Sequence, residues 1–139
     1  DLGCGSGILS LIALKLGANI TFSVDTDSLA ISATKINSAL NDVPEDLLNV
    51  SLGSIEELEV NIPETKIDLM LCNILTPVIK SLGPDFGKII GYKGKVILSG
   101  LLIGQIKELQ EFFLRLGWEV LDVQTKDQWA LMILTRKLF

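Results

Sequence analysis

The chain opens with D-L-G-C-G-S-G (residues 1–7), a loop with glycine at every second position, and a helical pattern follows from Ile8 to Leu16. Glycines so placed let the backbone turn sharply and approach a ligand with no Cβ in the way. The helix N-terminus behind the loop presents free N–H groups and a partial positive charge, which suit a carboxylate or a phosphate. The pattern predicts a ligand-binding loop at the end of a strand, with a purely structural turn as the alternative.

The spacing of these glycines separates two kinds of ligand. A dinucleotide-binding loop has the pattern G-x-G-x-x-G, in which the helix N-terminus holds a pyrophosphate. Counted from Gly3 and Gly5, the third glycine of that pattern would fall on Ile8. The spacing therefore disfavours an NAD-binding domain, which stays a rival hypothesis.

Beyond the loop, short apolar runs alternate with helical patterns, as in a parallel α/β sheet. The predicted strands are 20–24, 47–52, 67–71 and 95–102, and the predicted helices are 28–40, 76–82 and 104–116, with one short helix within 53–65. Two final strands, 118–124 and 129–137, are too close together for a helical crossover and must form an antiparallel hairpin. The expected fold is α/β, a doubly wound and mostly parallel sheet that ends in an antiparallel β-hairpin.

Helical spacing also predicts which faces of two helices turn inward. In the helix 28–40 the inward residues are Ala30, Ala33, Asn37 and Leu40, and in the helix 104–116 they are Ile106, Leu109, Phe112, Phe113 and Leu116.

The composition of the 139 residues excludes several classes of site. The chain has no histidine, which rules out Ser-His-Asp and Cys-His catalysis within it and leaves no expectation of a metal site. Its net charge is −5 and its Lys and Arg residues are scattered singly, so direct nucleic-acid binding is not expected. No apolar run is long enough to predict a membrane span. The two cysteines form no disulfide framework, and a monomer in a reducing cytoplasm is expected.

An acidic residue follows the predicted strand 20–24. Asp25 closes the run Ile20 to Val24, where an ionised carboxylate can accept hydrogen bonds from both vicinal hydroxyls of a ribose. Asp27 is better explained as the cap of the next helix. The alternative for Asp25 is an ordinary loop carboxylate, and an NAD-binding domain would carry such an acid too.

An asparagine lies just beyond the predicted strand 67–71. Asn73 follows Asp68 to Cys72, at the carboxyl end of a strand, which is where ligands bind in open α/β sheets. Its amide offers both donors and an acceptor. Asn73 and the backbone carbonyl of Ile74 are candidate groups for holding an amine, with an ordinary turn as the alternative. Pro77 is expected to keep Thr76 extended.

Five segments in order resemble the ribosomal protein L11 methyltransferase family, and the similarity spans nearly the whole chain. They are D-L-G-C-G-S-G-I-L-S (1–10), V-D-T-D-S-L-A-I-S-A-T-K-I-N (24–37), C-N-I-L (72–75), V-I-L-S-G-L-L (96–102) and D-Q-W-A-L-M-I-L-T-R-K (127–137).

This resemblance implies an enzyme that transfers methyl groups from S-adenosyl-L-methionine to lysine or α-amino groups of a large-subunit ribosomal protein. Residues matching Gly3, Asp25 and Asn73 contact the cofactor in that family, and the rest of the loop (Cys4, Gly5, Gly7) is expected to belong to the same site. Ser54, after the predicted strand 47–52, is a candidate for contact with the adenine. Trp118 is expected in the core, and Trp129 either there or beside the substrate.

The chain also departs from the family pattern. The family's N-terminal substrate-recognition domain is absent, and no strand precedes the glycine loop, so we expect residues 1–139 to be a methyltransferase catalytic domain that lacks its first strand. Thr76-Pro77 stands where many members have a small residue and glycine before the proline. Three alternatives stay open: a methyltransferase acting on a small molecule, one acting on RNA, or an inactive remnant that at most binds the cofactor.

Overall fold

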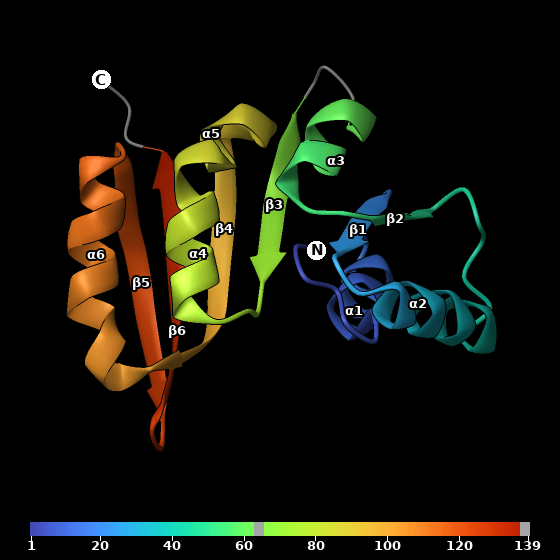
Figure 1. Cartoon of the computed structure of the whole chain (residues 1–139), viewed down its shortest axis with the longest axis horizontal. Coiled ribbons are helices and arrows are strands. Elements are labelled where there is room, and N and C mark those ends of the chain that lie inside the picture. The colour runs from blue at the N-terminus through green and yellow to red at the C-terminus, as the bar shows by residue number, and fades with distance from the viewer. Residues whose placement is uncertain (63–65, 137–139) are drawn as a thin grey trace. The chain divides into compact units, whose positions relative to one another are not determined.

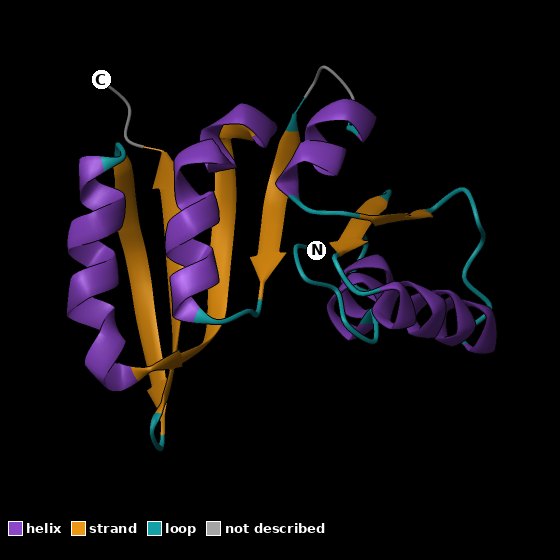
Figure 2. Cartoon of the chain, in the orientation of Figure 1, coloured by secondary structure: helices purple, strands orange, loops and turns teal. Residues whose placement is uncertain are grey.

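The computed structural model describes residues 1–62 and 66–136, which fall into two compact units. The N-terminal unit is Asp1–Ile62 and the C-terminal unit is Pro63–Phe139, and each is described here by itself. Figure 1 labels the helices and strands of both, and Figure 2 separates helices, strands and loops by colour.

The N-terminal unit alternates helices with a pair of parallel strands. Its elements are α1 (Ile8–Lys15), β1 (Thr21–Asp25), α2 (Ser28–Leu40), β2 (Leu48–Leu52) and α3 (Ile55–Asn61). The two strands pair in parallel register from Thr21↔Leu48 to Asp25↔Leu52, and Leu2 makes a parallel bridge with Val24. These pairings bring the glycine loop and the end of β2 to the carboxyl end of β1.

Local sequence explains the helix boundaries of this unit. Asp27 caps α2 as predicted, because its carboxylate accepts a hydrogen bond from the Leu29 N–H at 2.8 Å. Gly17 ends α1 with φ 103°, a conformation that costs glycine little. The predicted helix 28–40 has the observed bounds of α2.

The C-terminal unit is a four-stranded mixed sheet with helices. Its elements are β3 (Ile67–Cys72), α4 (Thr76–Leu82), the 3₁₀ turn η1 (Gly83–Asp85), α5 (Phe86–Ile89), β4 (Ile90–Leu102), the 3₁₀ turn η2 (Ile103–Gln105), α6 (Ile106–Arg115), β5 (Trp118–Lys126) and β6 (Trp129–Arg136). The strand order is β3-β4-β6-β5, in which β3 and β4 are parallel, whereas β6 is antiparallel to both of its neighbours. The predicted terminal hairpin is therefore confirmed, although Lys137 lies outside the described residues.

Large apolar side chains fill this second unit. Ile79 of α4 and Leu109 and Phe113 of α6 have no exposed surface, because α4 and α6 lie along the sheet (Figure 1). Phe86 stacks on Phe113 with ring centroids 5.8 Å apart and meets Trp118 edge to face at 6.4 Å. Trp118 thus belongs to the core, as expected.

Several sequence-based expectations are wrong in detail. The predicted α2 face is partly right, because Ala30, Ala33 and Asn37 are half-buried. Leu40 is 76% exposed, however, and the buried positions are Thr34 and Ser38. Leu116 is also exposed, since it follows the last turn of α6. Pro77 does not keep Thr76 extended: Thr76 begins α4, and a proline in the first helical turn sacrifices no hydrogen bond.

Two further elements differ in extent. The strand predicted at 95–102 is longer than expected, because β4 begins at Ile90, and the short helix α5 before it was not predicted. The short helix predicted within 53–65 is α3, and residues 63–65 lie outside the described part of the chain. Within residues 1–62 and 66–136, no helix has the length and apolar character needed to cross a membrane.

Candidate functional site

The glycine loop adopts a backbone that requires its glycines. Gly3, Gly5 and Gly7 all have positive φ, at 76°, 55° and 80°. Any other L-residue is strained in this region by contact of its Cβ with the backbone. The start of the loop is fastened to β1, because the N–H groups of Gly3 and Cys4 both donate to the Val24 carbonyl at 2.9 and 3.0 Å.

Two of these glycines serve different purposes. A Cβ on Gly5 would meet no atom within 4 Å, so the backbone here faces open space that a ligand can enter. A Cβ on Gly7 would lie 2.7 Å from Cγ2 of Thr34, which means that Gly7 permits close packing against α2. Gly5 therefore borders open space, whereas Gly7 is a packing position.

The polar side chains of α2 hold the loop from behind. The Thr34 hydroxyl donates to the Gly5 carbonyl at 3.1 Å, and the Asn37 amide donates to the Ser6 carbonyl at 2.8 Å. These bonds explain why Thr34 is buried where the hydrophobic pattern predicted alanines: the loop's carbonyls need donors. Sequence reasoning missed both roles, although Thr and Asn three positions apart on one helix face were a usable signal.

Cys4 contributes backbone to the loop, and its side chain points inward. The thiol is buried and lies 3.4 Å from the Thr34 hydroxyl oxygen. Burial raises the pKa of Cys4 above its ordinary value, and the hydrogen bond to Thr34 works in the opposite direction. The raised pKa and the burial both favour the neutral thiol.

Asp1 caps α1 through Ser10, which lies nine residues further along the chain. The sequence did not suggest this role. Gly7 precedes the helix and has no side chain to cap it, but the Asp1 carboxylate accepts from both the N–H of Ser10 at 3.1 Å and its hydroxyl at 2.8 Å. The hydroxyl oxygen of Ser10 lies 2.6 Å from the hydroxyl oxygen of Ser23 on β1. This network ties the glycine loop, α1 and β1 together and places a negative charge at the positive end of the helix.

Asp25, at the end of β1, lies against the glycine loop. Its Oδ2 accepts from the Gly5 N–H and its Oδ1 from the Asp27 N–H, both at 3.0 Å. A carboxylate has about four acceptor positions, so both oxygens keep the capacity to accept from a ligand. The partly exposed carboxylate is therefore oriented by backbone and still available.

Ser54 also comes to this end of the unit. The Gly53 N–H donates to the Asp25 carbonyl at 2.9 Å, so the backbone before Ser54 adjoins the candidate ribose-binding acid. Ser54 precedes α3, yet its side chain makes no capping hydrogen bond and is half-buried. The structure brings Gly5, Asp25 and the Ser54 segment together at the carboxyl ends of β1 and β2.

In the C-terminal unit, Asn73 follows β3 directly and is exposed. Its amide lies against Gly100 of β4: a Cβ built on Gly100 would be 2.2 Å from Oδ1 of Asn73. Among the described residues, the Asn73 amide has no side-chain hydrogen bond, so its donors and acceptor face no competing partner. Ile74 follows with a half-buried side chain, and its carbonyl is the group of interest.

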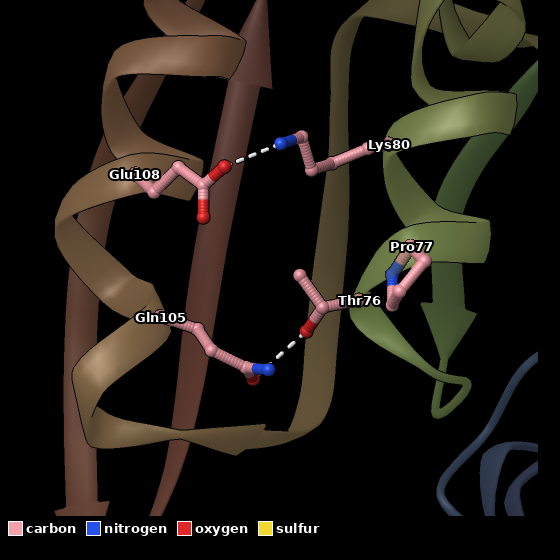
Figure 3. A pocket seen from close by; sticks show the side chains of 5 residues that line it. All are labelled: Thr76, Pro77, Lys80, Gln105 and Glu108. Carbon is pink, nitrogen blue, oxygen red and sulfur yellow. Dashed lines mark hydrogen bonds and ion pairs between the residues drawn. The ribbon is translucent and has the colours of Figure 1, made fainter.

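The residues after Ile74 are fastened to the end of β4. The buried Thr76 hydroxyl donates to Oε1 of Gln105 at 2.8 Å, and the Leu102 N–H donates to the same oxygen at 2.9 Å. Figure 3 shows this pair beside the Lys80–Glu108 ion pair, across a hollow of about 430 Å³ lined by Thr76, Pro77, Lys80, Gln105 and Glu108. Because the charges of Lys80 and Glu108 are paired with each other, the hollow offers little unpaired charge to a ligand.

Other groups of this unit have plain roles. Burial raises the pKa of the Cys72 thiol to about 12, and a hydrogen bond from the Ile74 backbone opposes this more weakly. Trp129 is half exposed, so it is not a core residue. Within the described ranges, no three Cys, Asp or Glu side chains are gathered as a metal site would need.

Comparison with known proteins identifies the family. A model of the family described as ribosomal protein L11 methyltransferase (PrmA) matches residues 1–137. The chain belongs to the ribosomal protein L11 methyltransferase family. The resemblance seen in the sequence is thereby confirmed.

Individual relatives agree with this assignment. A ribosomal protein L11 methyltransferase from Prochlorococcus marinus is 46% identical over 136 residues, which are 98% of this chain and 45% of that protein. One from Parasynechococcus marenigrum is 47% identical over 99% of this chain and 47% of its own length. The chain therefore spans about half the length of the curated relatives it matches.

A solved structure of the same kind confirms the fold. The ribosomal protein L11 methylase from Lactobacillus delbrueckii subsp. bulgaricus superposes with a TM-score of 0.88 at 26% identity, over 99% of this chain and 68% of that one. The expected α/β class, with parallel strands and a terminal antiparallel hairpin, is thus confirmed for a member of the ribosomal protein L11 methyltransferase family.

Proposed function

We propose that the protein transfers methyl groups from S-adenosyl-L-methionine to amino groups of a large-subunit ribosomal protein. The observation that carries this proposal is the open glycine loop with the Asp25 carboxylate hydrogen-bonded to Gly5 at 3.0 Å. Membership of the ribosomal protein L11 methyltransferase family supports the reaction and the acceptor. We place the reaction in the cytoplasm and expect the enzyme to act as a monomer.

The residues of the N-terminal unit fit this cofactor. Gly5 leaves space where a Cβ would otherwise stand, and Asp25 has acceptor capacity for the two hydroxyls of a ribose. We assign Gly3, Cys4, Gly5 and Gly7 to the loop that holds the cofactor, the first three through their backbone and Gly7 through its packing. Ser54, whose hydroxyl caps nothing, is assigned to the adenine side.

Chemistry at the sulfonium needs little from the protein. The cofactor would supply a methyl group already activated by the positive sulfur. The protein's contribution is alignment of donor and acceptor, which avoids the entropic cost of bringing them together. No general base is assigned among the residues of this chain.

The acceptor amine must be neutral before it can attack. A lysine has an ordinary pKa of about 10.4, and desolvation lowers it. We assign the Asn73 amide oxygen and the Ile74 carbonyl to hold the protons of the neutral amine, and the Asn73 amide also to the cofactor. Both groups are held just beyond β3, on a segment anchored through Thr76.

Binding of the demethylated cofactor tests the first part of the proposal. Calorimetry on the full-length protein should show S-adenosylhomocysteine binding and no NAD binding. Asp25→Asn should weaken that binding at least 10-fold, because two hydroxyl donors lose a charged acceptor. Asp46→Asn, on an exposed loop, is the matched control and should change nothing. Affinity for NAD alone would contradict the proposal.

Methyl transfer tests the second part. Full-length protein, labelled S-adenosylmethionine and separated large-subunit ribosomal proteins should yield one labelled protein band, and Asn73→Ala should reduce its labelling strongly. Labelling of ribosomal RNA instead, or of small molecules only, would change the acceptor. Cofactor binding without any transfer would show that the protein binds but does not catalyse.

A further inference from the structure

β4 contains a bulge at Gly100. Between Leu98 and Leu101 the strand has one residue more than its partner β6, where Met132 and Ala130 are the matching positions. Gly100 lies in this irregular step with φ 70°, the left-handed conformation that glycine supplies in one common kind of bulge. Bulges of this kind redirect the strand and occur beside functional sites more often than elsewhere.

The bulge brings the Gly100 backbone against the Asn73 amide. A Cβ on Gly100 would lie 2.2 Å from Oδ1 and 3.3 Å from Cγ of Asn73, well inside van der Waals contact. The space that a side chain would need is therefore the space in which the Asn73 amide sits. Any residue other than glycine would push that amide away.

This close approach is not explained by core packing. Gly94, earlier in β4, is buried, and a Cβ there would meet Ile90 and backbone carbonyls. Gly100 and Asn73 are both exposed, so no apolar core requires them to touch. What the contact determines is the direction of one polar side chain.

The far end of the same segment is held separately. Gln105 accepts from the Thr76 hydroxyl and from the Leu102 N–H with a single oxygen, which ties the start of α4 to the turn after β4. The segment 73–76 is thus held at Thr76 by Gln105. At its other end, the Asn73 amide occupies the space that the missing side chain of Gly100 leaves open.

We propose that Gly100 is a positioning residue for methyl transfer. Because it has no side chain, it leaves the space that the Asn73 amide needs to keep the orientation used in the reaction. The inference rests on the proposed function, in which Asn73 contacts the cofactor and the acceptor amine. Gly100 itself touches neither, and its whole effect passes through Asn73.

The test is Gly100→Ala in the full-length protein, compared with two glycine controls. Gly117→Ala has the same backbone strain, since φ is 81°, but its Cβ would meet no atom within 4 Å. Gly104→Ala also enters open space and has no positive φ. Gly100→Ala should lower kcat/KM about 10- to 100-fold through the displaced amide, with the same division between kcat and KM as Asn73→Ala. Both controls should keep wild-type kinetic constants.

A double variant decides whether the effect passes through Asn73. In an Asn73→Ala background the obstructed amide is gone, so Gly100→Ala should change kcat/KM by less than about 2-fold. Two outcomes overturn the proposal: wild-type kinetics for Gly100→Ala, or a second full loss of activity in the double variant.

An independent measurement separates this inference from the proposed function. If the wild-type protein transfers no methyl group, the proposed function fails, and the positioning is then read from the side-chain amide resonances of Asn73 by nuclear magnetic resonance. Those resonances should shift in Gly100→Ala and stay in place in Gly117→Ala. Unshifted resonances in Gly100→Ala overturn the seating of Asn73.

Discussion

The N-terminal unit buries several hydroxyl side chains beside its apolar core, whereas the C-terminal unit buries mainly large apolar side chains. Ser10, Ser23, Thr34 and Ser38 are all buried in the first unit, and hydroxyls among them hold the glycine loop or its neighbours in place. In the second unit the fully buried side chains include Phe86, Phe113, Ile79 and Leu109.

This difference predicts which substitutions should affect ligand binding and which should affect stability. A loop held by backbone conformation and hydrogen bonds can lose its ligand without losing much stability, because few apolar contacts depend on it. A unit held by packed rings loses stability first, because each ring fills volume that no other group can fill.

The largest effect is expected in the apolar core. Phe113→Ala should lower the free energy of unfolding by about 3–5 kcal/mol, since it removes a fully buried ring and leaves a cavity beside Phe86. Denaturant unfolding measures this. Leu114→Ala, one residue along α6 and 60% exposed, is the control and should cost little. Equal losses for both variants would contradict the packing description.

A glycine pair tests the other unit. Gly7→Ala should destabilise the fold by about 1–3 kcal/mol, because its methyl group overlaps Thr34 and its φ is positive. Gly5→Ala should cost only about 1 kcal/mol in strain while abolishing measurable S-adenosylhomocysteine binding, since its methyl group enters the open side of the loop. Thermal unfolding and calorimetry on both variants separate the two roles. Reversed behaviour would exchange the two assignments.

A smaller effect should appear at alkaline pH. Folding raises the pKa of Cys72 from 9.0 to about 12, so the unfolded chain loses this proton first. The stabilisation is complete below pH 9 and is lost as the pH rises from 9 towards 12. At about pH 10 the loss should be about 1.4 kcal/mol. The measurement is the free energy of unfolding as a function of pH for the wild type and for Cys72→Ala. The wild-type curve should fall more steeply in this range, and identical slopes would refute the prediction.

The smallest effect should appear in acid. The hydrogen bond from Lys80 lowers the pKa of Glu108 below 4.5, and the attraction of the two charges adds to it. The contribution is therefore present above pH 4.5 and is lost as the pH falls through the lower, folded value. Because Glu108 is exposed, we expect a small difference between wild type and Glu108→Gln, and none at high salt. A large, salt-independent difference would mean that the pair is more than a surface interaction.

Much of the site could be read from single residues. The loop glycines, Asp25 and Asp27 could be identified from the sequence because their chemistry is local. Glycine reaches positive φ, and a carboxylate directly after a strand or before a helix is typical of a binding group or a helix cap. The hairpin was predictable because a short connection leaves the chain no other route.

The residues that hold the site in place could not be read in this way. Thr34 and Asn37 looked like parts of an ordinary helix until the loop's carbonyls were placed beside them. Asp1 caps a helix that begins seven residues later. Each of these roles needs a partner distant in sequence, and hydrophobic periodicity carries no information about hydrogen-bond partners.

The α/β class, the family, the glycine loop and the position of Asn73 at the end of a strand could all be predicted from the sequence. Three features are visible only in the folded chain: β6 lies between β4 and β5, α2 buries Thr34 and Ser38, and Gly100 lies against the Asn73 amide. The physical reason is that periodicity and backbone preference act between near neighbours. Strand order and the seating of one side chain on a distant glycine depend on contacts that exist only once the chain has folded.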